Sequence, residues 1–213
     1  MKSITLSLLF ITLTLSGYSQ ITVPDTLFDF KNYATDNTPP GWTTALTGRG
    51  KMCDWRIVND NENKVLAQTS SETPDYRFNL ITNNNLILKD IEISVRFKAV
   101  KGSGDQGGGP VWRYKDENNY YVVRANPLEN NYRVYKVVNG NRIQLKSATV
   151  KMTSGKWYNL KVIMKGNNIQ CYFNDHLKLQ TDDNTFPESG KIGLWTKSDA
   201  VTWFDDLLVK TAK

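Results

Sequence analysis

Residues 90–100 read DIEISVRFKAV, and apolar and polar side chains alternate along the whole stretch. Ile91, Ile93, Val95 and Phe97 share one face, while the polar residues between them share the other. A period of two with one apolar face is typical of a half-buried strand in an antiparallel sheet. The stretch therefore predicts that this segment is a strand lying on the core of a β-protein.

The same period continues along the rest of the chain. Residues 155–179 read GKWYNLKVIMKGNNIQCYFNDHLKL, where two short polar breaks predict a three-strand meander. Turns rich in Gly, Pro and Asn separate the other strand candidates, and no window shows helical spacing over three turns. The length suits one domain. The sequence thus predicts a single all-β sandwich of two antiparallel sheets over residues 20–213.

The first residues have the layout of a secretory signal peptide, assigned to residues 1–19. Lys2 precedes an apolar run at residues 4–15, and small residues follow as far as Ser19. The run is too short to span a bilayer. We expect cleavage after Ser19 and a secreted or periplasmic protein without a membrane span; a buried N-terminal strand is the alternative.

The charge pattern argues against a nucleic-acid partner. The chain has 27 Lys and Arg against 21 Asp and Glu, a formal net charge of +6. The basic residues alternate with apolar ones and do not cluster as a phosphate-binding surface requires. We therefore expect no nucleic-acid binding, and we expect a monomer.

The cysteines and the histidine limit the chemistry. Cys53 and Cys171 would be able to form a disulfide outside the cytoplasm, but two free thiols fit equally well because the sequence does not fix their separation. His176 is the only histidine and falls in a hairpin turn. Zinc sites need several His or Cys ligands, so a zinc centre is not expected.

The segment NNYYVVRANPLENNYRVYK, residues 118–136, concentrates tyrosine, arginine and asparagine. Alternation places Tyr120 and Arg124 on one face of the first strand, and Arg133 and Tyr135 on one face of the next. Aromatic rings stack on the C–H faces of sugars, and guanidinium groups donate hydrogen bonds to hydroxyls. We predict a carbohydrate site on this face; a solvated face with ordinary cross-strand pairs is the alternative.

Two further residues are assigned to this site. Arg113, on the preceding strand, is predicted to join the same face, and Trp195 is expected beside it. Three guanidinium groups with few carboxylates nearby are too costly to bury, so the face is predicted not to be core but to be wet, ion-paired or a binding site.

Three longer segments carry a family resemblance: GGGPVWRYKDENNYYVVRANPLENNYRVYKVVNGNR, GKWYNLKV and GKIGLWTKSDAVTWFDDLLV. Together they resemble the 3-keto-disaccharide hydrolase domains, over residues 23–209. The resemblance implies a concanavalin A-like jelly roll, related to laminin G-like modules, with a concave glycan-facing groove. It also implies an activity on oxidised glycosides.

The implied chemistry needs a base and a positive group. A 3-keto group acidifies the C2 proton, so the glycosidic bond can break by elimination. The candidate catalytic residues are Arg124 and Lys197 for the positive charge and Asp199 for the base. Arg113 is an alternative source of positive charge, and Glu117 and Glu129 are alternative bases. Classical hydrolysis needs two flanking carboxylates, and the Glu-x-Asp-x-x-Glu strand pattern of laminarinase-type enzymes is absent.

Three functions therefore remain open from the sequence. The domain is an enzyme that cleaves glycosides, a non-catalytic glycan-binding module that uses the same groove, or a laminin G-like surface for a protein partner. No cofactor is identified apart from a structural calcium, which sandwiches of this class often hold near a C-terminal aspartate, here Asp206. Hydrogen-bonded edge aspartates are the alternative at that position.

Overall fold

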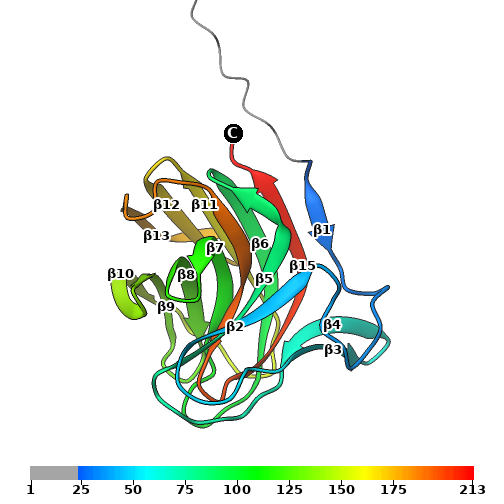
Figure 1. The fold of residues 1–213 in the computed structure, drawn as a ribbon. Coiled ribbons are helices and arrows are strands. Elements are labelled where there is room, and N and C mark those ends of the chain that lie inside the picture. Colours follow the sequence, from blue (N-terminus) through cyan, green and yellow to red (C-terminus); the bar gives the residue numbers. More distant parts are fainter. Residues whose placement is uncertain (1–23) are drawn as a thin grey trace, which may run out of the picture.

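The computed structural model describes residues 24–213, so the signal peptide assigned to residues 1–19 lies outside the described residues. The described chain consists of strands and connecting loops, with no helix and hence none that could cross a membrane. Two antiparallel sheets pack face to face (Figure 1). The predicted all-β sandwich is confirmed.

The strands divide between the two sheets as follows. Sheet A has the order β13-β12-β11-β6-β15-β4-β3, with β1 also paired to β15. Its strands are β1 (Thr26–Phe28), β3 (Trp55–Asp60), β4 (Asn63–Gln68), β6 (Ile91–Lys101), β11 (Tyr158–Lys165), β12 (Asn168–Phe173), β13 (His176–Asp182) and β15 (Val201–Thr211). Sheet B has the order β10-β9-β8-β7-β14-β5-β2. Its strands are β2 (Trp42–Gly48), β5 (Arg77–Leu88), β7 (Gly108–Asp116), β8 (Asn119–Asn126), β9 (Asn131–Val138), β10 (Asn141–Thr149) and β14 (Gly190–Lys197).

The stretch that predicts the fold forms the centre of sheet A. It becomes β6, which pairs with β11 on one side and β15 on the other. Its alternate apolar residues are fully buried, and Val95 lies opposite Leu160 of β11. The predicted meander follows as β11, β12 and β13. The period of two therefore identified both the strands and their buried faces.

The central strands of sheet B are buried on both of their faces. Trp112, Tyr121 and Val123 point into the core between the sheets. Tyr120 and Val122 belong to a second apolar cluster on the outer face, together with side chains of β5, β7, β9 and β14. The sequence predicted that only the inner face of this sheet is core, so the burial of the outer face needs its own explanation.

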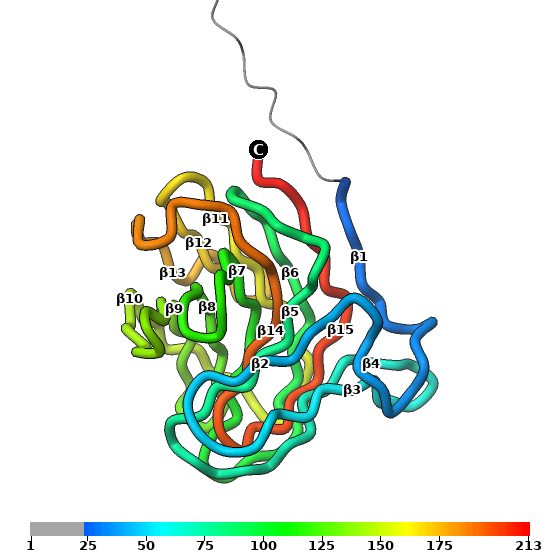
Figure 2. Tube along the Cα trace, in the orientation of Figure 1, coloured from blue at the N-terminus to red at the C-terminus, as the bar shows by residue number. Residues whose placement is uncertain are grey.

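Long loops cover one end of that outer face. The segment between β2 and β5, coloured cyan to teal in Figure 2, sweeps round the lower end of the molecule. The Arg77 guanidinium donates hydrogen bonds to the carbonyls of Arg49 and Lys51, and the Tyr76 hydroxyl donates to the Gly140 carbonyl at the β9–β10 turn. These bonds tie the loops to sheet B.

The cysteines do not pair. Cys53 and Cys171 are both free and buried, so the second of the two alternatives left by the sequence is correct. Burial raises the pKa of both thiols. Both groups therefore remain protonated at neutral pH and contribute packing rather than reactivity.

Candidate functional site

The outer face of sheet B gathers most of the predicted site residues. Arg124 of β8 lies directly opposite Arg133 of β9, and Tyr135 shares the same face of β9. Trp195 of β14 belongs to the same face, and Lys197 follows it two residues later. The alternation of the sequence thus placed residues from three strands on one surface.

Two carboxylates connect the basic side chains of this face. Arg124 Nη2 lies 2.8 Å from Asp105 Oδ2 and 2.7 Å from Glu129 Oε1. Lys197 Nζ lies 3.5 Å from the same Asp105 oxygen. Arg133 Nη1 lies 3.1 Å from Glu129 Oε2. We call these five residues the charged cluster.

Glu129 is the residue that allows two arginines to face each other. It lies in the short turn between β8 and β9 and bridges Arg124 and Arg133, which would otherwise repel across the strand pair. It also accepts hydrogen bonds from the amides of Asn126 and Asn131. The Arg124 hydrogen bond in particular lowers the pKa of Glu129 to about 2.

This lowered pKa predicts an acid-sensitive contribution to stability. The pKa of Glu129 in the folded state lies below its ordinary value of 4.5, so its contribution is present above that value and is lost as the pH falls toward about 2. Glu129→Gln is expected to be less stable than wild type at pH 7 and to lose less stability between pH 5 and pH 2. Urea unfolding at each pH measures this difference. An equal loss of unfolding free energy between pH 5 and pH 2 in the two proteins would contradict the prediction.

Asp105 reaches the charged cluster from the glycine-rich loop between β6 and β7, residues 102–107. The Gly107 amide donates to its carboxylate, and a Cβ at Gly107 would lie 2.1 Å from Arg124 Nε. The loop can approach Arg124 this closely only because that position has no side chain. Asp105 is 1 % exposed, so its carboxylate depends on Arg124 and Lys197 for charge compensation.

Asp199, predicted as the base, anchors this loop. Its carboxylate accepts hydrogen bonds from the backbone amides of Ser103, Gly104 and Asp105. Burial favours the neutral acid, but these amide donors outweigh it and lower the pKa of Asp199. A carboxylate with its oxygens occupied and its pKa lowered is a poor base, so its evident role is to position Asp105.

The aromatic rings expected to stack on a sugar are covered. Tyr120 and Trp195 are 0 % exposed and Tyr135 is 4 % exposed. The Trp195 indole nitrogen lies 3.2 Å from the Tyr120 hydroxyl, which in turn lies 2.9 Å from Thr47 Oγ1. With Phe78 these rings form what we call the aromatic floor. The expectation that this face is not core is wrong for the rings.

Arg113 does not join this face. Its strand shifts register between Trp112 and Asp116, and Arg113 has a φ of 45°, so the alternation fails at that point. Its guanidinium donates to the carbonyls of Lys89, Phe186 and Gly166 at 2.9, 2.7 and 2.6 Å. Arg113 therefore joins three loops at the end of the sandwich, and its predicted place among the sugar-binding residues is wrong.

The surroundings of Asp206 do not suit calcium. Its carboxylate lies 3.3 Å from Arg96, which also lies 3.7 Å from Asp205. No group of three His, Cys, Asp or Glu side chains within residues 24–213 is placed to hold a metal ion. Calcium needs several oxygen ligands, whereas here one guanidinium already lies against both carboxylates.

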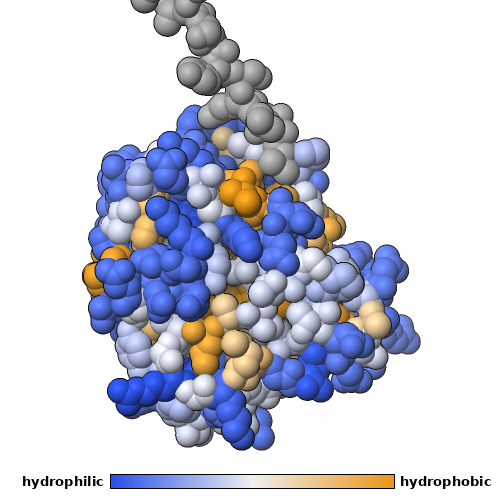
Figure 3. Space-filling view, viewed as in Figure 1, coloured by the Kyte–Doolittle hydropathy of each residue, from blue (hydrophilic) through white to orange (hydrophobic). Residues whose placement is uncertain are grey.

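A cleft of about 450 Å³ lies beside Asp206 on the outer face of sheet A, lined by Leu27, Ser94, Arg96, Trp157, Tyr158, Asn159, Asp206 and Leu208. Its charged groups are already compensated, since Arg96 pairs with Asp206 and stacks on Trp157. The face of the molecule seen in Figure 3 is largely hydrophilic, with scattered apolar patches. We therefore place the candidate site on sheet B.

Two residues of the site were missed from the sequence. Asp105 is not among the residues predicted for the site, although it is the only acidic residue in the glycine-rich loop. Arg142 is not among them either. It lies over the aromatic floor, with its guanidinium carbon 4.6 Å from the ring centre of Tyr135 and 5.0 Å from that of Phe78.

Comparisons with known proteins bear on this arrangement. Residues 25–210 match the model of the 3-keto-alpha-glucoside-1,2-lyase-like domain. The chain belongs to this family. The family predicted from the sequence is therefore confirmed, and the comparison with curated proteins finds no match.

Solved structures show the same fold. The carbohydrate binding module CBM66 from Bacillus subtilis is 22% identical with a TM-score of 0.67, covering 80% of this chain and 96% of its own. The Emp47p carbohydrate recognition domain is 17% identical with a TM-score of 0.60, covering 90% and 97%. A putative glycosyl hydrolase from Parabacteroides distasonis is 14% identical with a TM-score of 0.53, covering 81% and 89%. At these identities the likeness establishes the fold alone.

Proposed function

We propose that this protein is a secreted carbohydrate-binding domain whose ligand contacts the charged cluster on sheet B. Export is supported by the signal-like pattern of residues 1–19. Sugar binding is supported by the family membership and by the names of the structural neighbours, among them a binding module and a lectin domain. The observation that carries the site is the charged cluster itself.

The chemistry of the charged cluster suits a polyhydroxylated ligand. Lys197 and Arg133 are partly exposed donors, and Glu129 is a partly exposed acceptor. Beneath them Arg124 and Asp105 are held rigidly by ion pairs and by the anchored loop. Sugar hydroxyls need donors and acceptors in a fixed arrangement, and a preorganised polar set of this kind supplies both.

A lyase acting on 3-keto-glycosides is the second candidate, favoured by the family description. Lys197 is partly exposed and would stabilise negative charge on a substrate carbonyl oxygen. The base is the weak point of this candidate. Asp199 is occupied by backbone amides, and the pKa of Glu129 is about 2, far below neutral pH. Binding without turnover is therefore the function that the geometry supports better.

Replacement of Lys197 tests the site. Lys197→Met is expected to weaken glycan binding roughly tenfold or more, because a hydrogen bond from a charged group contributes about 1.5–3 kcal/mol. Lys165→Met is the matched control, since Lys165 is exposed on sheet A at the end of β11. Titration calorimetry with glycans found on an oligosaccharide array gives the affinities.

The same proteins separate the remaining functions. Release of sugar from a 3-keto-glucoside, with the unoxidised glucoside as control, would favour the lyase. Saturable glycan binding without release supports the binding module. No binding to any glycan, or equal loss in Lys197→Met and Lys165→Met, would refute the proposed site and leave a laminin G-like protein surface as the explanation.

A further inference from the structure

Arg142 stands out on the same face because its guanidinium has no charged partner. It comes from β10, the edge strand of sheet B, and reaches back over the aromatic floor to within 5.8 Å of the Trp195 ring centre. In residues 24–213 no carboxylate forms an ion pair with it, whereas Arg124, Arg133 and Lys197 all have one. Its Nη1 atom is buried without a hydrogen-bond partner.

Such an arrangement is costly in the absence of a ligand. Removing a charged group from water without hydrogen bonds has a high free-energy cost, and burial here lowers the pKa of Arg142. Stacking on aromatic rings recovers only part of this cost. The residue as a whole remains partly exposed, while its Nη1 atom is buried. Arg142 is therefore an unused hydrogen-bond donor at the edge of the candidate site.

The charges of the charged cluster and of Arg142 indicate which kind of ligand would bind Arg142. Arg124, Arg133, Arg142 and Lys197 carry positive charge, and Asp105 and Glu129 carry negative charge. Both carboxylates are already shared among the first two arginines and the lysine. After burial, the charges of Arg124 and Asp105 also act on the pKa of Arg142, so Arg142 lies within the electrostatic field of the charged cluster. These six side chains retain an excess of two positive charges, and Arg142 itself forms no ion pair within residues 24–213.

We propose that the natural ligand is an acidic glycan, and that its carboxylate or sulfate group binds Arg142. This inference rests on the proposed function. A planar guanidinium presents paired donors that match the oxygens of either anion. The neutral part of the sugar contacts the charged cluster. The anion pairs with Arg142, which has no charged partner within residues 24–213. A neutral glycan would leave the Arg142 guanidinium without a charged partner.

The test uses an array of matched neutral, uronate-containing and sulfated oligosaccharides, followed by calorimetry on the best of each kind. Wild type is expected to bind at least one acidic series roughly tenfold or more tightly than its neutral counterpart. Arg142→Gln is expected to lose that preference, so that the ratio of its acidic to its neutral affinity falls toward one. Arg142→Lys, which keeps the charge without the planar fork, is expected to retain part of it. Lys165→Gln is the control and should match wild type.

The outcomes are distinct. Preference for uronate or for sulfate identifies which anion the site takes. Neutral sugars bound as well as acidic ones would overturn this inference and leave the proposed function standing. An equal loss of neutral and acidic binding in Arg142→Gln would show that the residue only supports the fold. Absence of binding to any sugar would refute both.

Discussion

Replacement of Arg124 by methionine is expected to lower the free energy of unfolding by about 3–5 kcal/mol, because a buried charge loses its main partner. Asp105 is 1 % exposed and would keep only Lys197, whose ammonium nitrogen is 3.5 Å away. Glu129 would lose the 2.7 Å contact that holds its turn against sheet B. Urea unfolding at neutral pH measures the loss.

A second replacement shows whether the uncompensated Asp105 carboxylate causes this loss of stability. Asp105→Asn in the Arg124→Met background removes the uncompensated charge, so the double variant is expected to be more stable than Arg124→Met alone. Arg133→Met is the matched control, because Arg133 is partly exposed and its loss leaves Glu129 paired with Arg124. A loss below about 1 kcal/mol in Arg124→Met, the range of exposed ion pairs, would contradict the buried pair.

The sequence was most informative where side-chain direction follows from backbone period alone. The alternation of β6 predicted its buried face, and the alternation of β8 and β9 brought Arg124 and Arg133 to the same surface. These are consequences of strand geometry and need no knowledge of distant segments. The family resemblance then supplied the sandwich topology, which local patterns do not determine.

The rest of the site depended on segments far apart in the chain. Tyr120 and Trp195 are buried on a face where Arg142 from the edge strand lies over Trp195 and the loop before β5 is bonded to the β9–β10 turn. Asp105 reaches Arg124 only because Asp199 fixes the glycine-rich loop. Neither arrangement leaves a periodic signal, and the register shift in β7 removed Arg113 from the face that alternation predicted.

Replacement of Arg113 by methionine is expected to cost about 3–5 kcal/mol of stability, because several buried acceptors lose their donor together. The guanidinium of Arg113 is 1 % exposed and satisfies three backbone carbonyls in three different loops. It also lies 3.4 Å from the Asp90 carboxylate. Thermal and urea unfolding measure the loss, with Arg49→Met as the control.

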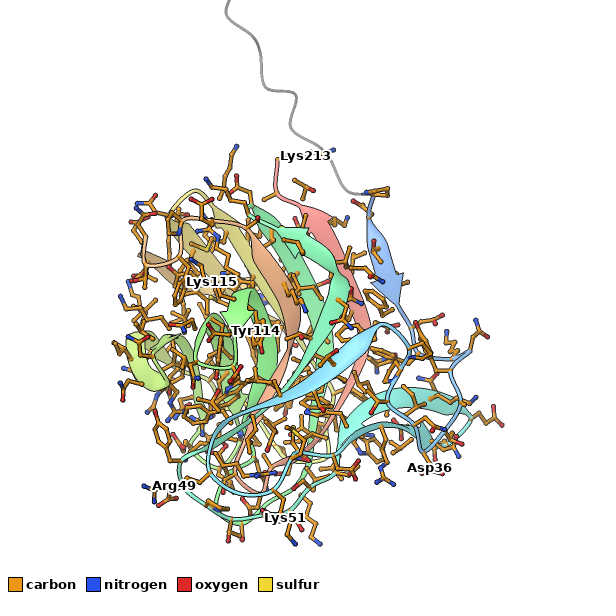
Figure 4. All side chains as sticks on the ribbon, in the orientation of Figure 1. Asp36, Arg49, Lys51, Tyr114, Lys115 and Lys213 are labelled. Atoms are coloured by element: carbon orange, nitrogen blue, oxygen red, sulfur yellow. The ribbon has the colours of Figure 1, made fainter. Side chains whose placement is uncertain are left out.

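Arg49 suits this comparison because its side chain is exposed at the lower edge of the molecule, as Figure 4 shows. Its replacement is expected to change stability by less than about 0.5 kcal/mol. Glycan affinity separates Arg113 from the proposed site. At a temperature where Arg113→Met is folded, it should bind sugar as wild type does, whereas Lys197→Met should not. A matching loss of affinity in both variants would mean that the loops joined by Arg113 belong to the binding surface, and the site on sheet B would have to be redrawn to include them.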